Sequence, residues 1–156
     1  MIIKITSGSG EASTELSAFD RALYNAGIGD YNLIRLSSVI PPDSEVIVEK
    51  VNRDPDRYGH KLYVVFSRCI ETTIEKEAWA GLGWMTQDNC KGRGLFVEQS
   101  GSSEQEVERL ISASLEDVVK YRTEDFGRIN IKTEGIKCKG KPVCSIVAAV
   151  YRDEGW

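Results

Sequence analysis

One short segment constrains the fold of this chain more than any other. It is an apolar, strand-like run that contains two adjacent serines and ends at two prolines, Leu36-Ser37-Ser38-Val39-Ile40-Pro41-Pro42. Residues 31–36 lead into it with the apolar pattern of a buried strand. Proline has no amide hydrogen for a sheet and keeps the preceding residue extended, so the strand stops there. We therefore expect the Ser37–Ser38 peptide bond at the rim of a sheet, where backbone can be held under strain and can react.

Length and composition indicate a single domain. The chain has 156 residues, of which 41% are hydrophobic, enough for a core without a disulfide or a structural metal. The net charge of -4 argues against nucleic acid and an anionic membrane as partners, and it suits a cationic small molecule. No apolar run reaches the roughly 18 residues of a membrane span, and segment 1–6 is too short for a secretory signal. These features predict a cytoplasmic protein.

The sequence lacks recognisable metal and nucleotide motifs. The four cysteines are Cys69, Cys90, Cys138 and Cys144. None forms a Cys-x-x-Cys pair, so we expect free thiols, and the single histidine, His60, has no companion ligand and is assigned no role. Residues 7–10, Ser-Gly-Ser-Gly, follow a first strand over 2–6, but they lack the third glycine and the lysine of phosphate-binding loops. We therefore predict a plain turn there.

The first helix is expected over residues 14–26, with Ser13 or Thr14 as its N-cap. Its apolar stripe contains Leu16, Phe19, Leu23 and Ala26. Because a helix turns by about 100° per residue, Asp20 falls on this same inward stripe. A carboxylate there needs a partner. It forms an internal ion pair or a bond to a loop amide, or it receives the cationic group of a ligand.

The remaining elements are strands and one further helix. Strands are expected over residues 44–51, 60–69, 74–85, 94–99, 126–137 and 143–151. A long helix begins after Ser102 or Ser103, and a turn at 139–142 joins the last two strands as a closing antiparallel pair. Glu98 stands at the end of the apolar strand 94–99. It reaches water there, or it is buried in a way that favours the protonated form that a general acid needs.

Two blocks of the sequence carry the pattern of a known family. The first is Glu15-Leu16-x-Ala18-Phe19-Asp20-x-Ala22-Leu23-x-Asn25-Ala26-Gly27-Ile28-Gly29, followed by Asn32-Leu33-Ile34-Arg35-Leu36-Ser37-Ser38 and the two prolines. The second is Gly94-Leu95-Phe96-Val97-Glu98. The chain resembles the pyruvoyl-dependent arginine decarboxylases over nearly its whole length, most loosely over 51–89. The resemblance implies one domain, residues 1–156, with an α+β fold: a layered αββα sandwich of mainly antiparallel sheets with helices on the outer faces.

The resemblance further implies that the chain cuts itself. In such proenzymes the hydroxyl of the residue matching Ser38 attacks the carbonyl of the residue matching Ser37, and the amide becomes an ester. Elimination then breaks the chain, and loss of ammonia leaves a pyruvoyl group derived from Ser38. The products would be a β chain, 1–37, and an α chain, 38–156. Asn32 matches the asparagine that assists this self-processing, and neither a metal nor pyridoxal phosphate is required.

The activity that the resemblance implies is conversion of L-arginine to agmatine and carbon dioxide through a Schiff base. Glu98 matches the proton donor, and Asp20 matches the residue that binds the guanidinium group of the substrate. The remaining substrate-binding positions would be Leu16, Gly29, Tyr31 and Val39. The family assembles as a homotrimer with sites between subunits, so Asp20 and Glu98 of one site can come from different chains. Polyamine synthesis and acid resistance are both uses that fit such an enzyme.

Two alternatives stay open at the level of sequence. Asp30 stands where relatives often have asparagine, and segment 71–90 aligns poorly, so the substrate is less constrained than the self-processing. The pyruvoyl enzyme could act on another amino acid, such as ornithine, lysine or histidine. The chain could also be an uncleaved, non-catalytic homologue that binds a cationic metabolite or a partner subunit. Asp30 itself either tightens a cationic ligand or faces solvent.

Overall fold

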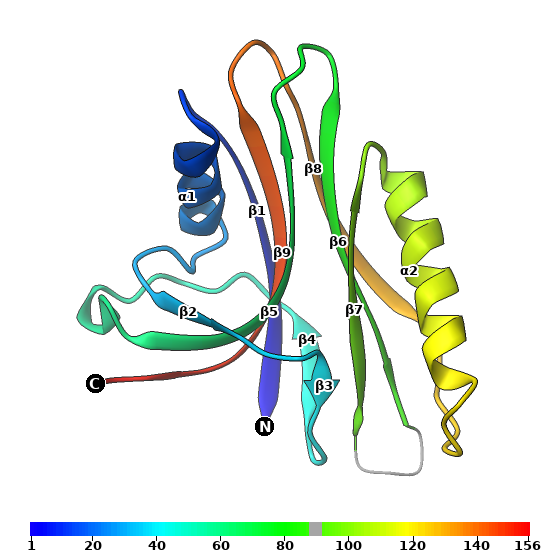
Figure 1. The fold of residues 1–156 in the computed structure, drawn as a ribbon. Coiled ribbons are helices and arrows are strands. Elements are labelled where there is room, and N and C mark those ends of the chain that lie inside the picture. The colour runs from blue at the N-terminus through cyan, green and yellow to red at the C-terminus, as the bar shows by residue number, and fades with distance from the viewer. Residues whose placement is uncertain (88–91) are drawn as a thin grey trace.

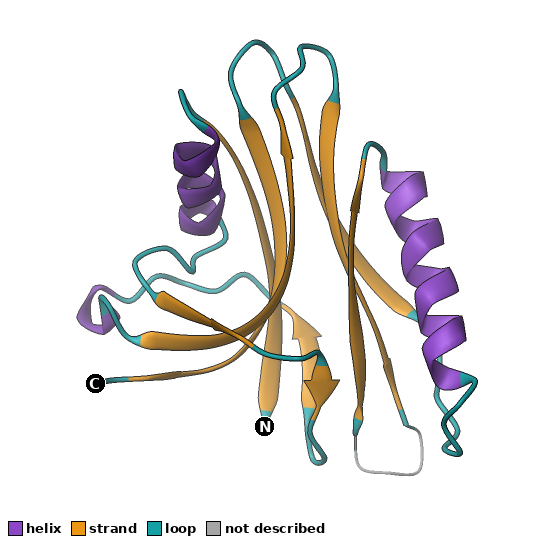
Figure 2. Ribbon diagram, in the orientation of Figure 1, coloured by secondary structure: helices purple, strands orange, loops and turns teal. Residues whose placement is uncertain are grey.

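The protein folds into two β-sheets that pack face to face, with one helix on the outer face of each sheet (Figure 1). The computed structural model describes residues 1–87 and 92–156. In chain order the elements are β1 (Ile2–Glu11), α1 (Glu15–Asn25), β2 (Asn32–Arg35), β3 (Val39–Ile40), β4 (Glu45–Val48), a 3₁₀ turn (Pro55–Arg57), β5 (Lys61–Glu71), β6 (Glu77–Thr86), β7 (Gly94–Gly101), α2 (Glu104–Val119), β8 (Asn130–Lys137) and β9 (Val143–Glu154). The four layers, coloured by element type in Figure 2, confirm the predicted α+β sandwich.

The order of the strands places the serine pair between the two sheets. The five-stranded sheet has the order β2-β5-β9-β1-β4, and the four-stranded sheet has the order β3-β7-β6-β8. Most neighbours are antiparallel, while β2 and β5, and β1 and β4, are parallel. Strand β2 is an edge of the first sheet and β3 is an edge of the second. Residues 36–38 therefore form the crossover from one sheet to the other, visible in Figure 1 between the labels β2 and β3.

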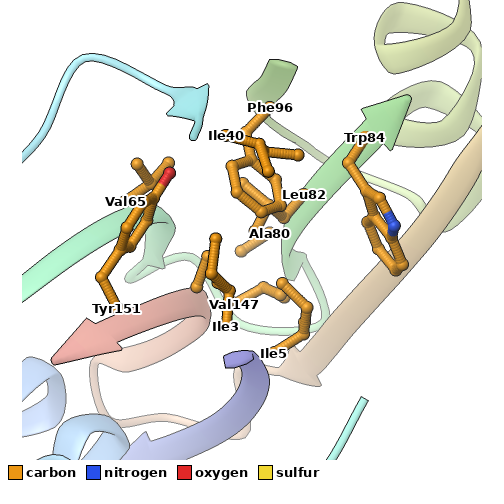
Figure 3. Packing of buried hydrophobic residues seen from close by; sticks show 11 residues of the cluster. Ile3, Ile5, Ile40, Val65, Ala80, Leu82, Trp84, Phe96, Val147 and Tyr151 are labelled. Atoms are coloured by element: carbon orange, nitrogen blue, oxygen red, sulfur yellow. The ribbon is translucent and has the colours of Figure 1, made fainter. Parts of the chain in front are cut away.

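The main core lies between the sheets (Figure 3). Its large side chains come from both layers: Ile3, Ile5, Val65, Val147 and Tyr151 from the five-stranded sheet, and Ile40, Leu82, Trp84 and Phe96 from the other. The Phe96 ring meets the Tyr151 ring edge-on, with centroids 6.2 Å apart. Burial of each such side chain stabilises the fold by roughly 1.5–3 kcal/mol. Tyr151 and Ile40 carry this core up to the crossover segment.

Helix α1 packs on the sheet through small residues, which corrects the predicted apolar stripe in part: Phe19, Leu23 and Ala26 pack on the core as predicted, but Leu16 and Asp20 do not. Ala18 and Ala22 are fully buried, whereas Leu16 is 76% exposed and Asp20 is exposed as well. The cause is Gly8 in β1, where a β-carbon would lie 2.5 Å from the carbonyl oxygen of Ala22. The helix thus approaches the sheet more closely than a leucine stripe allows, and the face with Leu16 and Asp20 turns outward. The N-cap is Thr14, as predicted.

Three further predictions about strands were wrong. Residues 7–10 are not a turn but continue β1 and pair with β9, because their glycines are needed beneath α1. Strand β2 is not buried, since it is the edge of its sheet and its ends are exposed. Strands β8 and β9 do not form a closing pair: β8 pairs with β6, and turn 139–142 carries the chain into the other sheet.

Helix α2 confirms the second predicted helix. Ser103 caps it, accepting a hydrogen bond from the Glu106 amide at 3.2 Å. Its buried residues Val107 and Ile111 lie directly over Gly81 and Gly83 of β6. The strand predicted over 74–85 is observed as β6 (Glu77–Thr86), and these glycines allow its close contact with another layer, as its pattern predicted.

The cysteines that the structure describes, Cys69, Cys138 and Cys144, are free thiols, as predicted, while Cys90 lies outside the described residues. Within residues 1–87 and 92–156, no helix is long and apolar enough to cross a membrane.

Candidate active site

The Ser37–Ser38 bond is held from both sheets. On its upstream side, the Leu36 amide donates to the carbonyl oxygen of Val64 in β5, at 2.9 Å. On its downstream side, the Phe96 amide in β7 donates to the carbonyl oxygen of Ser38, at 2.8 Å. The bond therefore joins two backbone segments that are each hydrogen-bonded to a different sheet. It lies at the rim of the sheets, as the position of the prolines predicted.

Ser38 has a strained backbone. Its φ of 63° lies in the left-handed region, where a β-carbon crowds the neighbouring carbonyl and costs about 1–2 kcal/mol. Such a conformation persists in a residue other than glycine only where its surroundings hold it, and it is concentrated at functional sites. The strain expected at the serine pair from the sequence is thus observed at the second serine.

Glu98 is the direct partner of the Ser38 side chain. The Ser38 hydroxyl donates to Oε2 of Glu98 at 2.8 Å. The other carboxylate oxygen lies 3.5 Å from the guanidinium of Arg35, and the Glu98 side chain is 19% exposed while that of Arg35 is 60% exposed. The glutamate therefore neither reaches freely into water nor lies in an apolar pocket: it is half-buried and paired at both oxygens. The structure brings together Ser38 and Glu98, which are sixty positions apart in the chain.

Tyr151 and Arg35 are functional candidates that the sequence analysis missed. The hydroxyl of Tyr151 donates to the carbonyl oxygen of Val39 at 2.9 Å. Burial, and then the negative charge of Glu98, raise the pKa of Tyr151, so its hydroxyl remains a neutral donor. In the sequence Tyr151 is one more large residue at the end of an apolar strand, and Arg35 is one charge beside the serines. No local pattern distinguishes either residue.

Asn32 lies at the opposite end of β2 from the serine pair. Its side-chain amide donates to the carbonyl oxygen of Gly59 at 2.6 Å, and its backbone amide donates to the carbonyl oxygen of His60 at 2.8 Å. Among the described residues, no hydrogen bond joins Asn32 to Ser37 or Ser38. The single chain therefore brings Glu98, but not Asn32, to the bond.

The predicted substrate-binding residues lie in three places. Leu16 and Asp20 are on the outer face of α1, Gly29 and Tyr31 are in the loop between α1 and β2, and Val39 directly follows Ser38. Tyr31 lines a cavity of about 340 Å³ together with Arg57 and Asp153. Glu98 lines a different, shallow cavity of about 190 Å³ with Arg35 and Phe66. Of the predicted substrate-binding residues, one chain by itself brings only Val39 next to Ser38.

Asp30 is already paired. Its carboxylate contacts the guanidinium of Arg53, and that guanidinium lies 4.1 Å from the centre of the Tyr24 ring. Asp30 is thus paired with an arginine of its own chain at a solvent-exposed position.

The chain matches one family model over residues 2–155, described as pyruvoyl-dependent arginine decarboxylase. Curated relatives with this name include one from Halobacterium salinarum, 34% identical over 153 residues, which are 97% of this chain and 94% of the relative. Another from Thermococcus kodakarensis is 33% identical over 147 residues, 94% of this chain and 91% of the relative. One from Methanocaldococcus jannaschii is 53% identical over 118 residues, 70% of this chain and 64% of the relative.

These matches cover both sheets and both helices, so they concern the whole domain rather than the serine motif alone. They define a protein of the pyruvoyl-dependent class. The chain belongs to the pyruvoyl-dependent arginine decarboxylase family, as the resemblance in its sequence had indicated.

Proposed function

We propose that this chain cuts itself between Ser37 and Ser38 and then converts L-arginine to agmatine and carbon dioxide. The observation that carries the proposal is the strained Ser38, whose hydroxyl lies 2.8 Å from Glu98 at a crossover between two sheets. The family supplies the reaction type and the substrate. The products of self-cleavage would be residues 1–37 and 38–156 of the single domain.

Self-cleavage needs only groups of this chain and water. The Ser38 hydroxyl oxygen bonds to the carbonyl carbon of Ser37 and the C–N bond breaks, so the hydroxyl proton passes to the freed nitrogen. Loss of the α-proton of residue 38 then breaks its Cβ–O bond and leaves Ser37 as a carboxylate. The enamine that results takes up a proton at Cβ to become an imine, and water then replaces the nitrogen, which departs as ammonia. The fixed amides on either side hold the reacting atoms close together, which is the main requirement of an intramolecular attack.

Asn32 is proposed to assist this step on the strength of its match to the family pattern. Its amide is bonded to Gly59 in the single chain. To act, it has to exchange that bond for the serine pair, or reach the serine pair of a neighbouring subunit.

The surroundings of residue 38 fit a pyruvoyl group. Such a group supplies an electrophilic carbonyl, which replaces pyridoxal phosphate and needs no metal. The carbonyl oxygen of residue 38 is already fixed by the Phe96 amide. Glu98, held by Arg35, carries its carboxyl oxygen to the same residue and is positioned to give a proton to the substrate α-carbon.

Arginine recognition is assigned to Asp20. A guanidinium is planar and always charged, so a carboxylate can bind it through two parallel hydrogen bonds. Asp20 is exposed on α1, away from Ser38 of its own chain. We therefore propose a homotrimer in which sites form between subunits, with Leu16, Gly29, Tyr31 and Val39 lining them. Exposure of two apolar side chains, Leu16 at 76% and Val39 at 56%, supports a surface that another chain covers. The product agmatine would serve polyamine synthesis or acid resistance in the cytoplasm.

Replacing Asp20 by alanine is expected to raise the KM for arginine by about tenfold to a hundredfold, because a hydrogen bond to a charged group contributes roughly 1.5–3 kcal/mol. Carbon dioxide release from labelled L-arginine measures this. Glu15→Ala removes an exposed carboxylate from the same helix and should leave the KM unchanged. An unaltered KM in Asp20→Ala would contradict the assignment. A wild type that cleaves itself, ignores arginine and accepts ornithine, lysine or histidine would favour the other pyruvoyl enzyme.

A further inference from the structure

Tyr151 links the two sheets beside the proposed cleavage point. It belongs to β9, in the middle of the five-stranded sheet, yet its hydroxyl donates to the Val39 carbonyl oxygen of β3 in the four-stranded sheet, at 2.9 Å. The residue is 9% exposed. Figure 3 shows its ring standing between the sheets with the hydroxyl pointing away from β9, near Phe96 and Val65. The contact joins residues that are 112 positions apart.

The strand that Tyr151 holds has few other attachments. Strand β3 is the edge strand of the four-stranded sheet, contains only Val39 and Ile40, and pairs with β7. The backbone carbonyl oxygens of the two residues after the Ser37–Ser38 bond therefore each accept a hydrogen bond from another strand. Ser38 is bonded by the Phe96 amide of β7, and Val39 is bonded by the Tyr151 hydroxyl of β9.

We propose that Tyr151 is a positioning residue, which holds residue 38 in place for self-cleavage and holds the new N-terminus of the α chain afterwards. The inference rests on the proposed function. Before cleavage, fixing the Val39 carbonyl keeps Ser38 in its left-handed conformation, with its hydroxyl on Glu98. Strained residues of this kind depend on such support.

After cleavage the role becomes larger. The cut removes the covalent tie between β2 and β3, and the hydrogen bond from Leu36 to Val64 then joins the β chain to the α chain but no longer holds residue 38. Residue 38 is then a chain end next to a strand of two residues. Tyr151 would tie this end to the five-stranded sheet by a side-chain hydrogen bond, in addition to the apolar packing of Ile40. Its raised pKa, caused by burial and by Glu98, keeps the hydroxyl protonated and able to donate at neutral and alkaline pH.

The test compares Tyr151→Phe with Tyr63→Phe. Tyr63 lies on the neighbouring strand β5 and is half-buried. Its hydroxyl donates to Glu154 at 3.0 Å, away from the serine pair. Each substitution removes one hydroxyl from a tyrosine of the same sheet, so Tyr63→Phe controls for the general loss of a hydrogen bond.

Three quantities are measured: the rate of self-cleavage by intact mass, kcat and KM for arginine in the fully cleaved protein, and Tm. Tyr151→Phe is expected to cleave about tenfold more slowly than the wild type, the size of effect of one buried hydrogen bond. Its kcat should fall while its KM stays constant, and its Tm should match that of Tyr63→Phe. Wild-type rates in Tyr151→Phe, or equal slowing in Tyr63→Phe, would overturn the proposal alone. A wild type that never cleaves would overturn the proposed function with it.

Discussion

Replacing Ser38 by alanine is expected to leave a full-length chain that releases no carbon dioxide from arginine. The substitution removes the hydroxyl that attacks the Ser37 carbonyl, and with it the only source of the pyruvoyl group in the proposed scheme. The backbone fold should survive, because the Ser38 side chain makes a single hydrogen bond, to Glu98, at the surface rim of the sandwich. Denaturing gels and intact mass after long incubation measure cleavage, and the same sample is assayed with labelled arginine.

Ser37→Ala is the matched control for Ser38→Ala. Residue 37 contributes its carbonyl group to the proposed attack, and alanine keeps that group, so this variant should still yield two fragments. Splitting between residues 37 and 38 in Ser38→Ala would mean that another nucleophile cuts the chain. The cleavage would then not produce a pyruvoyl group from Ser38.

Replacing Glu98 by glutamine is expected to leave self-cleavage intact and to slow the decarboxylation of arginine. The glutamine carbonyl can still accept a hydrogen bond from the Ser38 hydroxyl, so the chain should still cleave. A carboxamide has no acidic proton to give, and positioned acids typically contribute 10²–10⁴-fold, so kcat for arginine should fall by at least about a hundredfold. Carbon dioxide release from the cleaved variant measures this effect, with the KM nearly unchanged.

Glu134→Gln is the control for Glu98→Gln. Glu134 is also a half-buried carboxylate in the four-stranded sheet, where it accepts hydrogen bonds from Ser7 and Ser9. Because its hydrogen-bond partners are Ser7 and Ser9 and not the serine pair, the variant should retain near wild-type kcat. Wild-type kcat in Glu98→Gln would place the proton donor elsewhere.

Local patterns were enough to predict most of the helices and strands, whereas the layered sandwich was implied by the family resemblance. The helix caps Thr14 and Ser103 follow from their own side chains and the residues just after them, and both are confirmed. The position of Asp20 could not be predicted this way. Which face of α1 turns inward depends on Gly8 in a strand that precedes it, and a pattern within the helix carries no information about that close approach.

The candidate site was predictable only in part for the same reason. The resemblance of two separate blocks assigned Ser38 and Glu98 to one kind of site, but it did not predict that the two side chains pair within one chain. Tyr151 belongs to neither block, and its role depends on the chain passing between sheets at residues 36–38. Contacts across such a crossover are set by the packing of whole layers, so they become visible only in the folded structure.

The most direct test of the account is the intact mass of the purified, denatured wild-type protein. We expect two chains, one of residues 1–37 that ends in the Ser37 carboxylate, and one that begins at residue 38 with a keto group in place of its amine. A single full-length mass after long incubation would contradict the account. The Ser37–Ser38 bond would then be inert, and the chain would be a non-catalytic homologue that binds a cationic metabolite or a partner subunit.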